Sequence, residues 1–552
     1  MADELLTMAD IARLAQVKLP AVSNWRRRHK DSFPESSRRQ GQDLFRGEDI
    51  AQWLDGRKIA RNDLAPGELP DTTYGIRFRR NLRLPMQLPE TTMRGLWRQI
   101  ERNQGTLSPA VQADLVLGLH YLRFRDPETW ARITSSEPSR VGSEIKYAAV
   151  RFVGERNLPM DYLSRAVLLP RWDAHGTSQL HALVQAIDLA WRDVEASGAS
   201  EGWIFDQLLA RFAVSEGRRG AEYLVPPEVV RLVVEALAPS PGDSVLDPWC
   251  GAGGLLVGLV DHVKRLGHDA SAMTVAGATP NQRSWWLTRM NCELHGVAAD
   301  VGVRPAMTLV DDPHRGRRFD IVLTNPPFNM KLREGDYRFD RPWRYGAPPR
   351  TNANFAWLQH VINVLSDRGR AAVLMPNGAS SSVHPSERAI RQRMVEDGVV
   401  DAIIGLPLGL FDATSIPVAV WILRAPAGVT DDDRVLFVDA RHFGHVAGRK
   451  RELSSAEVDR IIEILRIWHA GELGDEVLSS NGDLVAVAGL DDMRAHDFRL
   501  SASVYVAKTF SDDDSVAKIH RLNDELDALG RRAVDVDAHA ASQLARVREW
   551  IP

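Results

Sequence analysis

The chain is 552 residues long, which is more than one hydrophobic core can organise and predicts about three to four domains. Its hydrophobic content of 44% and charged content of 26% are ordinary for a globular protein in water. It has no apolar run of about 18 residues and no signal-peptide pattern at its start, so we expect a cytoplasmic protein that does not enter a membrane. Cys250 and Cys292 are the only cysteines, which excludes a disulfide framework and a cysteine-rich zinc site, and no metal is expected.

The formal net charge of −4 is unexpected for a protein that binds DNA over most of its surface. Basic residues are nevertheless clustered at positions 26–30, 38–39 and 315–318. Phosphate contacts need only a local basic surface, so these clusters keep DNA binding open. If the chain does bind DNA, its acidic total suggests that a partner subunit holds part of the duplex.

Residues 1–62 are predicted to form a separate small module. Apolar residues between Met8 and Ala15 share one helical face, and Pro20 opens a second helix. The pattern resembles a winged helix-turn-helix of the MerR or excisionase kind, with residues 41–46 as the wing. The alternative is a helical pair whose basic face is only solvated or meets a protein partner. In a DNA-binding module, the second helix would bring to a groove the side chains of Ser23, Asn24, Arg26 and Arg27.

The next two segments are a linker and a helical domain. Residues 63–74 contain prolines and a glycine that break helix and strand alike, which predicts a linker. From residue 75 to 215 the apolar residues recur at helical spacing. The residues expected in the core of this helical domain include Leu96, Ile100, Leu115, Leu119 and Leu122.

Residues 216–445 are predicted to form an α/β domain. Short apolar segments alternate with helix-like stretches, which is typical of a doubly wound, Rossmann-like parallel sheet. The glycine-rich stretch Asp247–Gly254 follows the first strand and opens a helix, so its backbone could approach a ligand closely. Such a loop is a weak signal alone, because it could equally serve a nicotinamide cofactor.

The most informative residues follow the apolar segment Ile321–Leu323, and they are Asn325, Pro326, Pro327 and Phe328. Open α/β sheets bind ligands where their strands end. The Asn325 side-chain oxygen and the backbone carbonyl before the second proline can each accept an N–H from one exocyclic amine, while Phe328 offers a face to a planar ring. Two acceptors draw the amine lone pair out of conjugation and prepare it to attack an electrophilic methyl. Taken alone, two prolines after a strand could equally be a rigid turn.

Residues 446–552 are predicted to be a mainly helical C-terminal region. The segment Leu453–Leu465 begins with a serine N-cap and carries an apolar stripe. Apolar residues at helical spacing between Val516 and Leu529 predict a further helix. Its stripe could dock a partner, or it could pack on its own domain.

Residues 75–510 resemble the modification subunit of type I restriction–modification systems, and Asn325–Phe328 resembles the Asn-Pro-Pro-Phe motif of amino-group DNA methyltransferases. Three further segments occur in the family's order, namely Met375–Gly378, Ser386–Arg391 and Gly405–Phe411. The resemblance implies methyl transfer from S-adenosylmethionine to N6 of an adenine that is flipped out of duplex DNA and stacked on Phe328. Cytosine N4 presents the same amine geometry and stays open. The implied partners are double-stranded DNA, a specificity subunit and a restriction subunit, and a homodimer also stays open.

The resemblance also implies a cofactor site, and this chain departs from the family there in three places. Val225 stands where threonine is usual, Thr279 where an acidic residue would pair with the ribose hydroxyls, and Met307 where an aspartate would meet the adenine amine. Losing the ribose carboxylate could cost about 1–3 kcal/mol, or roughly tenfold to a hundredfold in affinity. The full implied set of cofactor residues is Glu222, Tyr223, Val225, Pro226, Asp247, Gly251, Ala252, Gly253, Thr279, Asn281 and Met307.

These departures support an alternative function. A catalytically weak or inactive methyltransferase fold could serve as a DNA-binding regulator that acts through its N-terminal module. The intact Asn325–Phe328 motif opposes this alternative, because a loop without chemical demand has little reason to keep those residues.

Overall fold

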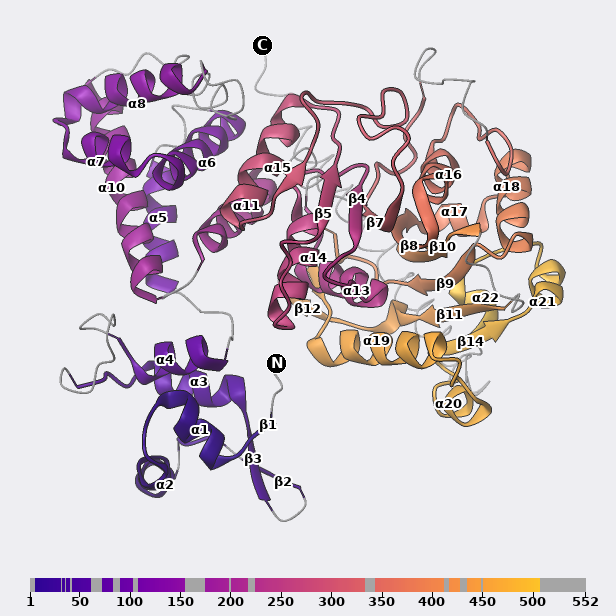
Figure 1. Cartoon of the computed structure of the whole chain (residues 1–552), viewed down its shortest axis with the longest axis horizontal. Helices are drawn as coiled ribbons and strands as arrows, with labels where there is room; N and C mark the ends of the chain where they lie inside the picture. Colours follow the sequence, from indigo (N-terminus) through magenta and orange to yellow (C-terminus); the bar gives the residue numbers. More distant parts are fainter. Residues whose placement is uncertain are drawn as a thin grey trace, which may run out of the picture.

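The computed structural model describes residues 5–30, 32–34, 36–39, 42–60, 72–82, 90–102, 108–153, 174–197, 200–216, 224–332, 343–411, 416–426, 434–447 and 450–506. They form a small N-terminal module, a set of helices, and an α/β domain built on a nine-stranded sheet (Figure 1). Among the described residues, no helix combines the length and hydrophobicity that a membrane span requires.

The N-terminal module contains two short helices, a β-hairpin and a third helix around one core. A three-stranded antiparallel sheet with the order β1-β3-β2 covers one side. Thr7 and Asp10 form a reciprocal capping box at the start of α1, and Phe45 of β3 is fully buried. The elements are β1 (Leu5–Leu6), α1 (Met8–Ala15), α2 (Leu19–Arg28), β2 (Ser37–Arg39), β3 (Gln42–Arg46) and α3 (Gly47–Asp55).

The module extends further than the sequence predicted. The helix α4 (Tyr74–Leu82), which the sequence analysis divided between the linker and the helical domain, packs on α1 and α3. Phe78 is fully buried in the core of the module, and the buried guanidinium of Arg79 lies 2.9 Å from the Asp55 carboxylate. Because the sequence of α4 is rich in arginine, it did not predict a helix that packs into the core of the module. The described part of the expected linker, residues 72–74, leads directly into this helix.

The helices that follow form a layer beside the α/β domain. The central helix α6 is buried on all sides between Gln112 and Leu122, except for half-buried Asp114, which explains why no single apolar stripe marks it. α6 and α11 pack on α15 of the α/β domain, and their apolar residues share one cluster with Trp285, Trp286 and Met290. The described helices of this layer are α5 (Glu90–Arg102), α6 (Pro109–Arg125), α7 (Pro127–Ser135), α8 (Pro138–Val153), α10 (Ala174–Ser197) and α11 (Glu201–Glu216).

The main sheet has the strand order β14-β11-β9-β10-β8-β7-β4-β5-β6. All neighbouring pairs are parallel except those that involve β10 and β14. The strands are β4 (Ser244–Asp247), β5 (Thr274–Gly277), β6 (Ala299–Asp300), β7 (Phe319–Thr324), β8 (Leu365–Pro376), β9 (Val400–Gly405), β10 (Val418–Arg424), β11 (Val435–Asp439) and β14 (Val485–Ala488). The predicted doubly wound sheet is confirmed, and its order reverses between β4 and β7.

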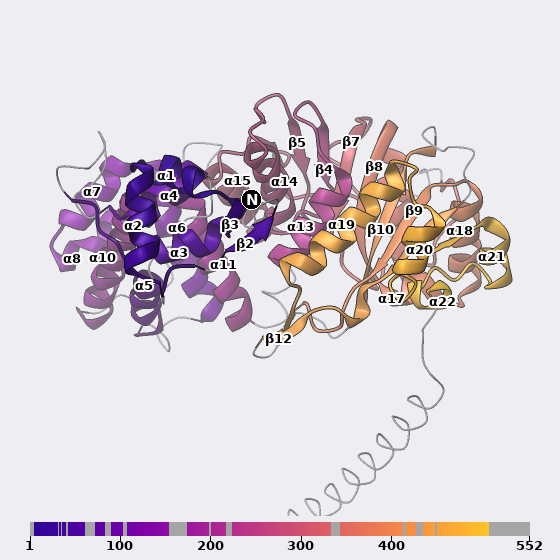
Figure 2. The ribbon, with the colours of Figure 1, turned by 90° about the horizontal axis from the view of Figure 1, so that it is seen from below.

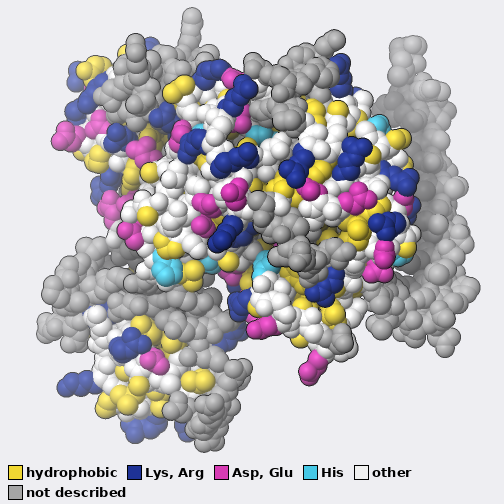
Figure 3. All heavy atoms as spheres, turned by 45° about the vertical axis from the view of Figure 1, so that its right-hand side comes forward, with side chains coloured by type: hydrophobic (Ala, Val, Ile, Leu, Met, Phe, Trp, Pro, Cys, Tyr) yellow, Lys and Arg dark blue, Asp and Glu magenta, His cyan; other side chains and the backbone are white. Residues whose placement is uncertain are grey.

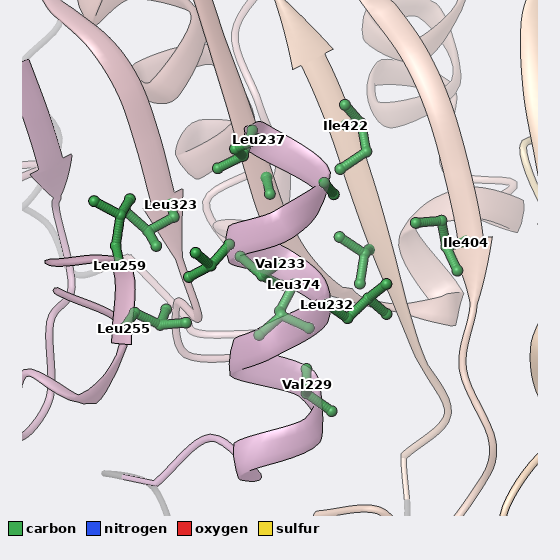
Figure 4. Packing of buried hydrophobic residues seen from close by; sticks show 14 of the residues in the cluster. Val229, Leu232, Val233, Leu237, Leu255, Leu259, Leu323, Leu374, Ile404 and Ile422 are labelled. Atoms are coloured by element: carbon green, nitrogen blue, oxygen red, sulfur yellow. The ribbon is translucent and has the colours of Figure 1, made fainter. Parts of the chain in front are cut away.

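Helices cover both faces of this sheet, so its strands are apolar on both sides. In β7, Ile321 and Leu323 pack with one apolar cluster and Val322 packs with the other. On the first face α13 (Pro227–Leu237) presents Leu232, Val233 and other apolar side chains to the strands (Figure 4). α14 (Gly254–Arg265) and α19 (Ser455–His469) pack on the same face (Figure 2). On the second face lie α16 (Asn354–Val364) and α18 (Pro385–Glu396), while α15 (Gln282–Leu294) joins the helical layer.

The C-terminal region is less purely helical than predicted. Ser454 is the expected N-cap of α19, and Glu457 completes a capping box with it. The same region also adds β14 to the edge of the main sheet and forms the hairpin β12 (His445–Ala447) with β13 (Lys450–Glu452). The remaining elements are α17 (Asn377–Ser381), η3 (Ala440–His442), α20 (Asp475–Ser480), α21 (Leu490–Ala495) and α22 (Ala502–Tyr505). The helix predicted between Val516 and Leu529 lies outside the described residues.

The position of α4 yields a test of the domain boundary. Deleting residues 1–60 removes α1 and α3, so α4 should lose its packing partners and its protection from amide hydrogen exchange. Deleting residues 1–85 removes α4 as well and should leave the unfolding midpoint of the remaining chain unchanged. Full protection of α4 after the shorter deletion would contradict its assignment to the module.

Candidate active site

A cavity of about 680 Å³ opens beside the carboxyl ends of β4 and β7. It lies at the point where the strand order reverses, which is where doubly wound sheets bind ligands. The glycine-rich loop and Asn325 form one side of it. The start of α13, the loop that contains Leu410 and Phe411, and Lys450 of β13 form other parts of the wall, and α11 closes it from the helical layer.

Asp247 ends β4 and is almost fully buried at the cavity. Its carboxylate accepts a hydrogen bond of 3.0 Å from the backbone N–H of Trp249. Burial raises the pKa of Asp247 to about 7, because a low-dielectric surrounding disfavours the charged carboxylate. A cationic group in the cavity would therefore favour the ionised form of Asp247. The ionised carboxylate would in turn stabilise the bound cation.

The glycine-rich loop is held from behind by polar side chains of α15. Thr288 donates to the carbonyl of Gly251 at 2.8 Å, and Asn291 donates to the carbonyl of Ala252 at 2.9 Å. Gly251 and Ala252 line the cavity. Gly253 has a φ of 83°, and a Cβ there would lie 3.1 Å from the Thr288 side chain. This glycine permits close packing on α15 and is not part of the cavity lining, so a cofactor contact at Gly253 stays a prediction.

Asn325 leaves β7 half-buried and faces the cavity, whereas Pro326 is buried and Phe328 packs against the core of the first sheet face. The turn after Phe328 is fixed by a reciprocal amide pair. Asn354 accepts from the backbone N–H of Asn329 at 3.0 Å and donates to the Asn329 side chain at 2.9 Å. This pair supports the left-handed backbone of Asn329, whose φ is 54°.

The remaining expected cofactor residues divide into three groups. Val225 and Pro226 line the cavity at the start of α13. Glu222 and Tyr223 lie outside the described residues. The cavity lining does not include Thr279, Asn281 or Met307, which lie beyond the end of β5.

Local packing occupies the three residues beyond β5. The buried Thr279 accepts from the backbone of Ala306 at 2.8 Å, and Asn281 caps α15 by accepting from Ser284 at 2.7 Å. Met307 is half-buried. These three residues are thus not part of the cavity lining, although their neighbours Ala278 and Thr308 hydrogen-bond the carbonyls of Asp247 and Pro248 at 3.0 Å and 2.7 Å. Their spacing in the sequence could not reveal this, because their position depends on how the loops after β5 pack.

Several cavity residues were not anticipated. Trp249 lines the cavity and packs edge-on against the buried Trp357, with ring centroids 5.4 Å apart. Phe411 and Lys450 approach from the other wall. Phe411 belongs to one of the segments that carried the family resemblance, so a signal for it was present. Lys450 had no such signal.

The second candidate site is the exposed face of α2 in the N-terminal module. Ser23, Arg27 and Lys30 line a surface hollow of about 490 Å³, and Arg27 donates to the Asn24 side chain at 2.7 Å. Arg26 also lines this hollow, and it forms a 2.9 Å ion pair with Asp43 of β3 and lies 5.3 Å from the centroid of the Phe45 ring. Arg26 thus links α2 to the hairpin.

The reciprocal amide pair of Asn354 should contribute measurably to folding. Asn354→Ala removes both bonds and leaves the Asn329 backbone unsupported, so we expect a loss of about 1–3 kcal/mol in the free energy of unfolding. Asn329→Gly removes one bond but suits the left-handed backbone, so its loss should be smaller. Urea unfolding of both variants tests this order. An Asn354→Ala variant as stable as the parent would show that the pair has no structural role.

Comparisons with known proteins identify the family of the chain. A family model described as N-6 DNA Methylase matches residues 200–514. The methylase subunit of the type I restriction enzyme HindI from Haemophilus influenzae is 32% identical over 317 residues, which cover 57% of this chain and 70% of that protein. The methylase subunit of the type I restriction enzyme MjaIX from Methanocaldococcus jannaschii is 28% identical over 324 residues, which cover 56% of each protein.

Solved structures show the same fold. The type I restriction-modification methyltransferase subunit from Streptococcus thermophilus aligns with a TM-score of 0.60 at 20% identity, covering 76% of this chain and all of that one. The matched family model spans more than half of the 552 residues. The relation thus rests on both sequence and fold, and the chain belongs to the N-6 DNA methylase family.

Proposed function

We propose that this protein transfers a methyl group from S-adenosylmethionine to N6 of adenine in DNA at the cavity between β4 and β7. The family and its methylase-subunit relatives support the reaction and its place in a restriction–modification system. The observation that carries the location is that Asp247 and Asn325, from two strands, line one cavity. A cavity of about 680 Å³ is also within the range of roughly 300–1,000 Å³ typical of cofactor sites.

The residues around the cavity fit the cofactor's methionine end. The buried Asp247 carboxylate suits an ammonium group, and the N-terminus of α13 beside Pro226 suits a carboxylate. Gly251 and Ala252 offer backbone to a close ligand. Thr279, Asn281 and Met307 remain candidates for the nucleoside end, because the chain neighbours Ala278 and Thr308 hydrogen-bond the loop that begins at Asp247.

The protein's part in the reaction is to hold a flipped adenine and polarise its amine. Asn325 and the carbonyl of Pro326 would each accept one N–H, and Phe328 would stack on the ring. These contacts leave the nitrogen lone pair free to attack while the amine stays in place. S-adenosylmethionine supplies the electrophilic methyl when bound and would leave as S-adenosylhomocysteine. The adenine nitrogen needs no general base before it attacks, because its extra proton would pass to water only after the N–C bond has formed.

Replacing Asn325 tests the proposed chemistry. Asn325→Ala removes one of the two acceptors, so we expect the turnover number to fall by about a hundredfold or more. The dissociation constant for S-adenosylmethionine should stay nearly unchanged, because Asn325 contacts the target amine. Asn363→Ala, at a half-buried asparagine of α16 that does not line the cavity, is the matched control. Parental turnover in Asn325→Ala would exclude this site.

The N-terminal module is proposed to bind DNA as a helix-turn-helix with α2 as its recognition helix. Ser23, Asn24, Arg27 and Lys30 are exposed or half-buried on that helix or just beyond its end. On the face in Figure 3, Lys and Arg side chains are interspersed with Asp and Glu side chains. A surface of mixed charge with a local basic face on α2 fits a duplex shared with a specificity subunit, which the type I relatives also suggest.

Two sets of variants separate DNA contact from folding in this module. Arg27→Ala with Lys30→Ala should weaken DNA binding and make its salt dependence shallower by about one unit for each phosphate that is no longer neutralised. The double substitution should not change thermal stability. Arg26→Ala should lower the stability of the module instead, because it breaks the link to Asp43. An unchanged salt slope in the double variant would indicate that the face meets a protein.

The alternative function is a DNA-binding regulator with an inactive methyltransferase fold. The substitutions at Val225, Thr279 and Met307 favour it, whereas the shared cavity of Asp247 and Asn325 opposes it. Calorimetric titration with S-adenosylmethionine separates the two functions. Heat with a dissociation constant at or below about 100 µM supports the enzyme, and no binding supports the regulator.

A further inference from the structure

One wall of the candidate cofactor cavity comes from the helical layer. Asp206, Ala210 and Ala213 recur along α11 at helical spacing and line the cavity opposite the glycine-rich loop. The width of the cavity therefore depends on how closely α11 is held to the α/β domain. The apolar contacts between α11 and α15 lie behind this wall. A further contact must hold the front edge of the wall, which is the side of α11 that faces α14.

A single histidine joins the two sides at that edge. His295 follows the last turn of α15, and its side chain is only 8% exposed. Its Nε2 lies 3.2 Å from the carboxylate of Asp206 on α11, and its Nδ1 lies 3.3 Å from the carboxylate of Asp261 on α14. Both aspartates line the cavity. One imidazole thus bridges the helical layer and the α/β domain.

The first turn of α11 is shaped for this contact. A Cβ at Gly202 would lie 2.4 Å from His295 Nε2, so only glycine lets the helix approach the ring this closely. The backbone carbonyl of His295 also accepts from Lys264 of α14 at 2.9 Å, which fixes the residue from its other side. These two contacts fix the position of His295 independently of the charge on its ring.

We propose that His295 is a positioning residue that clamps α11 against α14 and thereby sets the width of the cofactor cavity. This inference rests on the proposed function, because it takes the cavity as the site of S-adenosylmethionine. In this proposal, the position of the helical layer directly affects the affinity of the chain for the cofactor. Without the bridge, the Asp206 and Asp261 carboxylates would repel each other across the front edge, and α11 would move outward.

The protonation state of His295 follows from its neighbours. Burial alone would lower its pKa, but the nearby carboxylates of Asp206 and Asp261 outweigh burial and raise the pKa to about 9. The nearby cation is Lys264 on α14, which lies 4.0 Å from Asp261. Because the folded pKa is above the ordinary value, the clamp is charged at neutral pH and is lost as pH rises through about 9.

The test measures binding of S-adenosylhomocysteine, the stable demethylated form of the cofactor, to the full chain by calorimetry. At pH 7.5, His295→Gln should weaken binding by about fivefold to tenfold. Asp206→Asn should do the same, and the double variant should be no weaker than either single variant. The Asp206 side chain is 44% exposed, so Asp206→Asn should fold even if His295→Gln does not.

A pH series separates the clamp from a general packing role. The ratio of the dissociation constants of His295→Gln and the parent cancels the ligand's own titration. This ratio should fall toward one between pH 7.5 and 9.5, which loss of packing alone would not produce. Equal affinity of the parent and both single variants at pH 7.5, or additive effects in the double variant, would overturn the proposal. A parent chain that binds no ligand would instead overturn the cofactor site itself.

Discussion

The pairing of β4 with β7 is the constraint on which the candidate site depends. The two strands are far apart in the sequence, yet Val245 pairs with Ile321 and Leu246 with Val322. Asp320 fixes this register at the amino end, where it accepts from Ser244 at 2.6 Å and from Ser366 of β8 at 2.7 Å. Since the chain leaves β4 toward β5 and leaves β7 toward β8, the loops diverge and a cavity opens between them.

The loops at this cavity are held mainly by residues outside the motifs. Thr288 and Asn291 of α15 bind the carbonyls of the glycine-rich loop, and Asn354 at the start of α16 fixes the turn after Phe328. Each contact uses a buried polar side chain, which would be costly to bury unless it made such bonds. The chemistry proposed for Asn325 thus relies on helices that contribute no atom to the reaction.

Much of the fold could be predicted from local pattern. The apolar segments before Asp247 and Asn325 are strands because both of their faces are covered, and the Ser454 N-cap marks the start of α19. Features that depend on tertiary packing could not be predicted. The sequence of α4 is mostly polar, and only its packing on α1 and α3 shows that Phe78 and Arg79 belong to the module. The strand β14 is defined by its pairing with β11, which its own sequence does not predict. Likewise, the cavity wall from α11 follows from the arrangement of whole elements.

The central claim is that the chain is an active adenine methyltransferase despite its unusual residues beyond β5. The most direct measurement maps N6-methyladenine across the genome of the source cells with and without the gene for this chain. We predict methylated adenines at one recurring DNA sequence in cells that carry the gene and unmethylated adenines at the same sequence in cells that lack it. Identical methylation maps in the two strains would contradict the account.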